Sequence, residues 1–178
     1  MGLSDLWNRL VRGDKTERVE EELRDKGSEQ PAAVEDYEGM KDDTAIDELE
    51  PAWDEGTRSE PYGKDEEVVR QLSANHRLVV GARAARLFAA RVDGEIASFC
   101  DLYSKGDIGQ IEAVMTREQF SNRGLARATV LAALAASREA GHDLTFLLAD
   151  RDDWPKELYR KLGFDEIGQA YEFIRPAA

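Results

Sequence analysis

The stretch at residues 121–127 carries residue types that can bind an anion. Arg123-Gly124-Leu125-Ala126-Arg127 places a glycine and two arginines where an alanine-rich apolar helix is expected to begin. The first turn of a helix has unpaired backbone N–H groups and the positive end of the helix dipole, and a glycine there lets a phosphate approach the backbone. The stretch fits a phosphate-binding loop, and it also fits a plain helix cap with two solvated arginines. It lacks the glycine spacing of the P-loop and of the dinucleotide fingerprint.

Three other side chains could carry chemistry. Glu112 lies two residues after Gln110 in a strand-like run, so its carboxylate could take a proton from a substrate or simply face water. Tyr159 could donate a proton, or it could be a core residue whose hydroxyl is satisfied. Cys100 alternates with apolar residues of another strand-like run and no neighbouring histidine is indicated, so we expect it to pack in the core.

The elements that must position these residues form an alternating pattern. Strand-like runs at residues 86–92, 95–103 and 107–116 are separated by Asp93-Gly94 and Lys105-Gly106, which suit tight hairpins and predict an antiparallel meander.

After the meander, the pattern predicts a buried helix over residues 123–140 and a continuous apolar strand over residues 143–150, expected to be central and covered on both faces. A helix opened by Pro155 and ended by Gly163 should follow, then final strands at 164–168 and 169–175. The fold class is therefore a mixed α/β sheet.

The first part of the chain is acidic and less regular. Residues 1–12 have the apolar spacing of an amphipathic helix, and a weaker helix is plausible over residues 17–26. Prolines and acidic residues make 28–64 look like a linker or partly ordered surface, and no convincing strand precedes residue 78. We therefore divide the chain into an acidic N-terminal region, 1–64, and a compact domain, 65–178, which opens on a short helix with an acidic first turn.

Taken in order, these motifs resemble those of the GNAT superfamily of acyl-CoA-dependent N-acetyltransferases, over about Asp65 to Pro176. The segment "SNRGLA" is similar to that family's loop Gln/Arg-x-x-Gly-x-Gly/Ala, and "LYRKLGF" is similar to its Leu-Tyr-x-x-Leu-Gly-Phe segment. "QIEAVMT" at residues 110–116 resembles the strand that precedes the loop.

The resemblance implies roles for specific residues. Glu112 would take a proton from the acceptor ammonium, and Tyr159 would protonate the departing CoA thiolate. Backbone groups of one strand segment would pair with the pantetheine amides, and the loop with its helix start would bind the pyrophosphate of acetyl-CoA, the co-substrate. The strand residues are Val114, Met115 and Thr116, and the loop residues are Ser121, Asn122, Arg123, Gly124, Leu125, Ala126 and Arg127.

The sequence also departs from the family's pattern. Ser121 stands where the loop normally begins with Gln or Arg, which removes one side-chain contact to phosphate but leaves the backbone groups in place. Asp152 and Pro155 stand where the family often has Asn and Ala, which affects contacts to the CoA arm. A regular first strand is not evident.

Charge and composition limit the partners. The net charge is −13, and residues 1–70 carry 22 acidic against 10 basic residues, whereas the rest of the chain is nearly balanced. Binding to nucleic acid through a basic face is therefore disfavoured. The negative electrostatic potential of the acidic half suits a cationic amine. No apolar run is long enough to span a membrane and no export signal is evident, so we expect a cytoplasmic protein. One cysteine and two histidines make a structural metal site improbable.

These observations predict an N-acetyltransferase that moves an acetyl group from acetyl-CoA to a primary amine of a small molecule or peptide by direct transfer. The alternative is a catalytically inactive GNAT-like module that binds CoA or a protein partner. A regulatory domain for another nucleotide is a third interpretation, which the sequence supports less because no ribose-reading or magnesium-binding pattern accompanies the loop. The sequence leaves the acceptor open, and a homodimer is compatible with it.

Overall fold

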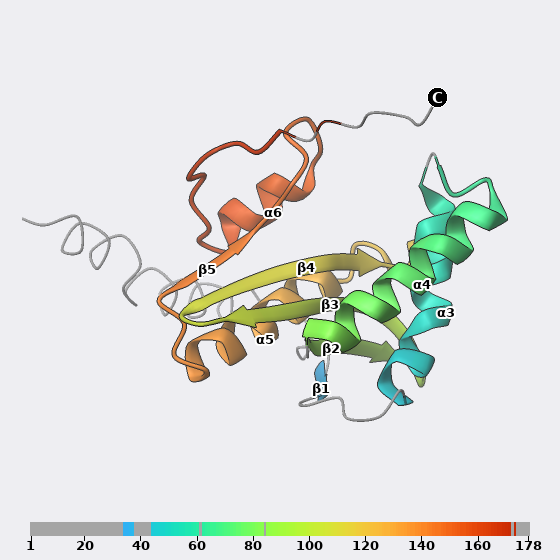
Figure 1. Ribbon diagram of the computed structural model, residues 1–178, viewed down its shortest axis with the longest axis horizontal. Coiled ribbons are helices and arrows are strands. Elements are labelled where there is room, and N and C mark those ends of the chain that lie inside the picture. Colours follow the sequence, from blue (N-terminus) through green and yellow to red (C-terminus); the bar gives the residue numbers. More distant parts are fainter. Residues whose placement is uncertain (1–33, 38–43, 61, 84, 172, 174–178) are drawn as a thin grey trace, which may run out of the picture.

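The computed structural model describes residues 34–37, 44–60, 62–83, 85–171 and 173. Their core is a five-stranded mixed sheet with the strand order β1-β2-β3-β4-β5 and with helices on both faces (Figure 1). The predicted mixed α/β class is confirmed. The two helices predicted over 1–12 and 17–26 lie outside the described residues.

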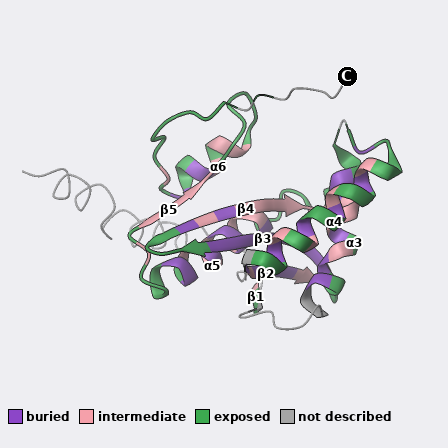
Figure 2. Cartoon of the chain, viewed as in Figure 1, coloured by how far each residue is buried: buried purple, intermediate pink, exposed green. Residues whose placement is uncertain are grey.

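The centre of the sheet is the predicted antiparallel meander. It consists of β2 (Arg86–Val92), β3 (Glu95–Lys105) and β4 (Ile108–Thr116). Asp93 and Gly94 have φ angles of 52° and 85°, the pair of positive values that a two-residue hairpin needs to match the strand twist. β3 is buried along most of its length, which makes it the central strand of the core (Figure 2).

A short first strand is present in the region where the sequence shows no convincing strand. β1 (Val34–Tyr37) pairs antiparallel with β2 and forms one edge of the sheet. Its sequence, VEDY, is only four residues long and half acidic, so it shows no clear alternation of apolar and polar residues. Arg86 and Arg91 of β2 pair with Asp36 and Glu35, which explains why acidic residues are accommodated at this edge.

One face of the sheet is covered by α5 (Leu125–Glu139), as predicted for the apolar helix. The helix buries its small residues against the strands, so its axis lies close to the sheet. The buried cluster on this side is apolar and includes Phe88, Cys100, Leu102, Ile111, Val130, Ala133 and Ala136.

The opposite face is covered by α3 (Thr44–Ser59) and α4 (Glu66–Arg83). The interpretation of 28–64 as a linker is therefore wrong for α3, which buries Ile46, Leu49 and Ala52 in the core. The apolar spacing was present in the sequence, but intervening acidic residues and Pro51 within the helix concealed it. The division of the chain at residue 64 stays a prediction, although α3, on its N-terminal side, shares a core with the sheet.

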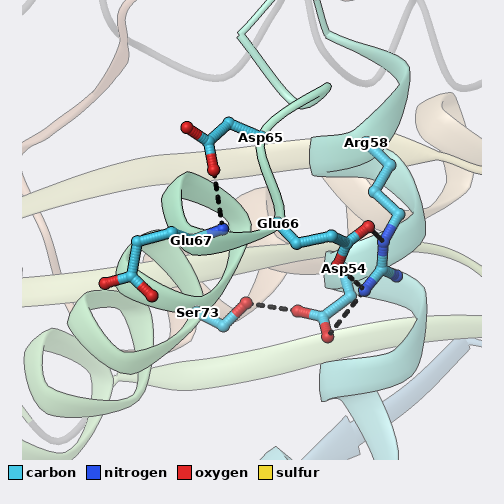
Figure 3. A network of polar contacts seen from close by, with 6 residues as sticks. All are labelled: Asp54, Arg58, Asp65, Glu66, Glu67 and Ser73. Carbon is cyan, nitrogen blue, oxygen red and sulfur yellow. Dashed lines mark hydrogen bonds and ion pairs between the residues drawn. The ribbon is translucent and has the colours of Figure 1, made fainter.

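Polar contacts join α3 to α4 on their outer side. Arg58 donates to both carboxylate oxygens of Glu66 at 3.0 and 3.1 Å and lies 3.9 Å from Asp54, while Ser73 donates a hydrogen bond to Asp54 (Figure 3). Asp65 accepts a hydrogen bond from the backbone N–H of Glu67 and so caps α4. These exposed pairs add little stability individually, but together they fix the register of the two helices.

The C-terminal part differs from prediction in two respects. β5 (Leu144–Leu147) pairs parallel with β4, but it lies at the edge of the described sheet and is only half-buried, so it is not the expected central strand. A continuous apolar run does not by itself distinguish a central strand from an edge strand.

α6 (Pro155–Lys161) follows as predicted, and Gly163 with φ 89° ends it. Residues 164–168 form no regular element, so the strand predicted there is wrong; part of the one predicted over 169–175 lies outside the described residues, and its described residues are not strand either.

Candidate active site

The predicted phosphate-binding residues lie at the start of α5. Gly124 is the N-cap, with φ 76°, and Asn122 before it also has a positive φ, 62°. A short 3-10 helix, η1 (Glu118–Phe120), leads into this turn. Side chains of Ser121 through Arg123 are exposed, and a Cβ placed on Gly124 would meet no atom within 4 Å. The first turn of α5 therefore faces open space, and no side chain caps it.

The predicted strand residues lie beside an open sheet edge. β4 pairs with β5 only from Ile108 to Ile111, and Figure 1 shows the two strands diverging. Val114, Met115 and Thr116 lie beyond that point, on a segment of β4 that still pairs with β3. On the side toward β5, no strand of the described chain covers them, so their outward backbone groups are available to an added extended ligand.

A bulge in β4 separates this segment from Glu112. Ala113 has φ 54°, and the register of β4 with β3 shifts between Phe99 and Asp101. Such a bulge turns the side chains of two successive residues toward the same face. Ala113 packs in the core under α3 and α4, and Glu112 lies directly opposite Asp101 on that same side.

Glu112 is half-buried and accepts a hydrogen bond from Gln110. Its side chain lies on the α3–α4 side of the sheet, beside a second carboxylate, Asp101. The role of Glu112 as a base stays a prediction.

Tyr159 reaches the sheet from the other side. It lies on α6, is 8% exposed and packs in the cluster under α5, near Val114 and with its ring edge toward Phe164. Burial raises the pKa of its hydroxyl to about 12, with further contributions from Cys100 and Asp153. The phenol therefore stays protonated at neutral pH. The structure thus places Glu112 and Tyr159 on opposite faces of the sheet, with the open part of β4 between them.

Cys100 is fully buried under α5, as expected. Burial, followed by the charge of Asp101, raises the pKa of its thiol. A buried thiol that stays protonated is a poor nucleophile, so its contribution is packing.

Sequence reasoning missed a buried polar cluster beneath α3 and α4. His76 Nε2 lies 2.8 Å from Asp101 Oδ2, and the Tyr103 hydroxyl donates to the same oxygen at 3.0 Å. The indole of Trp53 stacks on the His76 ring at 3.8 Å, with the two planes 1° apart. The alternation in β3 could have indicated Asp101, since it falls on an inward position between Phe99 and Tyr103.

α3 is held close to the open segment of β4. A Cβ on Gly56 would lie 1.6 Å from the sulfur of Met115, so a larger residue there would require the Met115 side chain or α3 to move. Arg117, directly after β4, donates to Glu55 of α3 and to Glu95 of β3. The helix that carries Trp53 is thereby fixed against the strand that carries Glu112.

Comparison with known proteins supports the resemblance. Residues 91–174 match the family model described as FR47-like protein. Ribosomal-protein-alanine N-acetyltransferase from Brucella melitensis biovar Abortus 2308 superposes with a TM-score of 0.61 at 16% identity, covering 80% of this chain and 99% of that one. The chain has the GNAT fold. The fold that the resemblance to the GNAT superfamily implies is therefore confirmed.

Two further solved structures contain a ligand. AAC(6')-Iy, in complex with the bisubstrate analogue CoA-S-monomethyl-acetylneamine, has a TM-score of 0.60 at 13% identity, with coverage of 83% of this chain and 100% of that one. PaiA N-acetyltransferase from Thermoplasma acidophilum, in complex with coenzyme A, has a TM-score of 0.56 at 12% identity, with coverage of 72% and 86%. No curated protein matches the sequence.

Two findings concern other kinds of site. No helix in the described part of the chain is long and apolar enough to cross a membrane. Among the described residues, no group of three His, Cys, Asp or Glu side chains is arranged to hold a metal ion.

Proposed function

We propose that this protein is an N-acetyltransferase that moves an acetyl group from acetyl-CoA to a primary amine by direct transfer. The observation that carries the proposal is the junction of β4 and α5, where an open helix start with a left-handed glycine follows an unpaired strand edge. Solved proteins of the same fold contain CoA or a CoA analogue, which supports acetyl-CoA as the co-substrate.

The residues at the junction fit two parts of acetyl-CoA, the pyrophosphate and the pantetheine. Backbone N–H groups of Gly124 through Arg127 and the dipole of α5 suit a pyrophosphate, and Gly124 leaves room for it. The backbone of Val114, Met115 and Thr116 suits the pantetheine amides, which would add to the sheet edge as a strand does. Ser121 is exposed and the backbone groups of the loop do not depend on its side chain, so its departure from the family's pattern does not remove the site.

Two side chains would move the protons. Acetyl-CoA supplies the acetyl group as an activated thioester. Glu112 takes a proton from the acceptor ammonium, which frees the nitrogen to form the new C–N bond as the C–S bond breaks. Tyr159 gives its proton to the departing sulfur and regains one from the solvent, a role that suits a phenol kept protonated by burial. The acceptor nitrogen loses a second proton to solvent when the amide forms.

A catalytically inactive CoA-binding module is the second candidate. The observations that favour it are the departures from the family's motifs at Ser121, Asp152 and Pro155 and the position of the two proton-transfer residues on opposite faces of the sheet. Both candidates predict binding of acetyl-CoA, and only the first predicts release of CoA in the presence of an amine.

Calorimetric titration with acetyl-CoA tests the shared part of the proposal. We expect micromolar affinity for the full chain, and neither heat nor a thermal shift at millimolar ligand would contradict both candidates. If binding is found, release of free thiol across a panel of primary amines separates the enzyme from the inactive module.

A further inference from the structure

The buried carboxylate of Asp101 has a free hydrogen-bonding position. Its side chain is 0% exposed, and Oδ2 accepts from His76 and Tyr103. Oδ1 has no partner, and among the described residues no lysine or arginine pairs with Asp101. An unsatisfied oxygen on a buried carboxylate is costly, and native proteins rarely keep one without a water or ligand to fill it.

A second unsatisfied atom lies in the same cluster. Nε1 of Trp53 is buried and donates to no acceptor in the described structure. Trp53 and Asp101 are separated by one ring stack and one hydrogen bond, both through His76. The cluster thus lacks a donor at one point and an acceptor at another. A molecule that supplies both would satisfy it.

The cluster is next to the candidate base. Asp101 and Glu112 are directly opposite on paired strands, so their side chains lie on the same face within about 5 Å at Cβ. Trp53 and Glu112 are half-buried, whereas Asp101 is fully buried. Two neighbouring carboxylates in partly desolvated surroundings attract a cation strongly.

We propose that Asp101 and Trp53 recognise the acceptor, an inference that rests on the proposed acetyl transfer. Asp101 Oδ1 accepts a hydrogen bond from the acceptor ammonium, and Trp53 Nε1 donates one to an oxygen on the same molecule. The substrate class is therefore primary amines that also carry a hydroxyl or carbonyl oxygen, such as amino alcohols and amino-acyl compounds. His76 and Tyr103 are positioning residues, because they hold Oδ2 and thereby orient Oδ1.

The test of Trp53 uses pairs of amines that differ in the oxygen. Ethanolamine is compared with propylamine, and glycinamide with isobutylamine, by the ratio of KM in Trp53→Phe to KM in the wild type for each amine. The variant keeps an aromatic ring beside His76 and removes the N–H donor together with the second ring of the indole, and this loss of ring area is the same for both amines of a pair. We expect KM to rise about fivefold to tenfold for the oxygen-bearing amines, the loss for one unsatisfied hydrogen bond, and to change less than about twofold for the alkylamines.

The test of Asp101 uses Asp101→Asn, which keeps the size of the side chain and removes its charge. We expect KM for every amine to rise about tenfold to a hundredfold, as for a hydrogen bond to a charged group, with KM for acetyl-CoA unchanged. Tyr103→Phe is the matched control, because it removes a donor to Oδ2 and leaves Oδ1 charged. It should raise KM for amines by a smaller factor.

One further measurement does not depend on turnover or on a folded variant. In the CoA-saturated wild type, the indole N–H resonance of Trp53 should shift on addition of ethanolamine and not of propylamine.

The outcomes separate the two proposals. If the wild type acetylates no amine of the panel, the proposed function fails, and the indole shift alone decides whether the amine site exists. If the wild type is active but Asp101→Asn leaves KM for amines unchanged, or if Trp53→Phe affects oxygen-bearing amines and alkylamines equally, the inference is overturned. A buried water would then fill the cluster.

Discussion

The two sides of the sheet are built differently. On the α5 side, the core is apolar and closed, and its one cysteine is held as a thiol by burial. On the α3–α4 side, the core contains His76, Asp101 and Tyr103, and two of its buried polar atoms have no partner. The unsatisfied atoms of Trp53 and Asp101 therefore share the polar side of the sheet.

The difference suggests that each side of the sheet binds a different substrate. The α5 side offers a rigid helix whose open start suits an anionic co-substrate, and the α3–α4 side offers carboxylates that suit a cationic acceptor. The unpaired segment of β4 lies between the two sides, and the co-substrate and the acceptor would meet there. Substitutions on each side should therefore affect different kinetic constants.

The largest expected effect is from Glu112→Gln on the acceptor side. Loss of a general base typically lowers kcat by roughly 10²- to 10⁴-fold, while the affinity for acetyl-CoA should be unchanged because the side chain lies on the other face from α5. Steady-state kinetics and calorimetry measure the two quantities. Glu118→Gln, on the exposed η1, is the control and should leave both unchanged. An equal fall in kcat for the control would refute the assignment.

Gly124→Asp should abolish most of the co-substrate binding on the α5 side. The new carboxylate would stand at the helix start where an anion is expected, and we expect affinity for acetyl-CoA to fall by about a hundredfold or more. Gly141→Asp is a close control. Gly141 has φ 77° against 76° for Gly124, and neither position has an atom within 4 Å of a new Cβ, but Gly141 follows the other end of α5. If both variants lose binding equally in calorimetry, backbone strain rather than an anion site explains the effect.

Gly56→Ala tests the close approach of α3 to β4. Its Cβ would overlap the sulfur of Met115, so the Met115 side chain or α3 must shift, and we expect the free energy of unfolding to fall by about 1–3 kcal/mol. Gly81→Ala in α4 meets no atom within 4 Å and should stabilise the protein by about 0.5–1 kcal/mol. Urea unfolding of the two variants measures the contrast. A stable Gly56→Ala protein with normal kinetics would show that α3 is not held as described.

The smallest expected effect concerns the ionisation of the Tyr159 hydroxyl, on the α5 side, at high pH. The pKa of Tyr159 in the folded protein is raised to about 12 from its ordinary value of 10. The folded state therefore resists ionisation, so wild-type stability should decline relative to Tyr159→Phe as the pH rises from about 10 to 12. Ultraviolet titration of tyrosine in the two proteins should show one late-ionising phenol missing from the variant. If the missing phenol titrates near pH 10 instead, Tyr159 lies in water.

The sequence predicted the α5 side well because its signals are local. Glycine turns at Gly94 and Gly124 and the apolar stretch of α5 each specify their own structure, and all three appear where predicted. The open edge of β4 could not be predicted, because it depends on how far β5 pairs with it, and that is a tertiary property.

The α3–α4 side was predicted poorly because its signals are dispersed. α3 combines an acidic surface with a sparse apolar stripe and an internal proline, and β1 is too short to show a period. The polar cluster assembles residues from α3, α4 and β3, which no sequence spacing relates. Glu112 was found only through the motif around it. The alternation in β3 could have indicated Asp101, but its place opposite Glu112 depends on the pairing of β3 with β4.

The most direct test of the central claim is release of free CoA from acetyl-CoA by the wild-type full chain, in the presence and absence of ethanolamine, with mass spectrometry of the amine. The account predicts amine-dependent thiol release and an acetylated product, and a strong reduction of both in Glu112→Gln. Binding of acetyl-CoA with no amine-dependent thiol release for any amine of the panel would contradict the claim that this protein is an acetyltransferase.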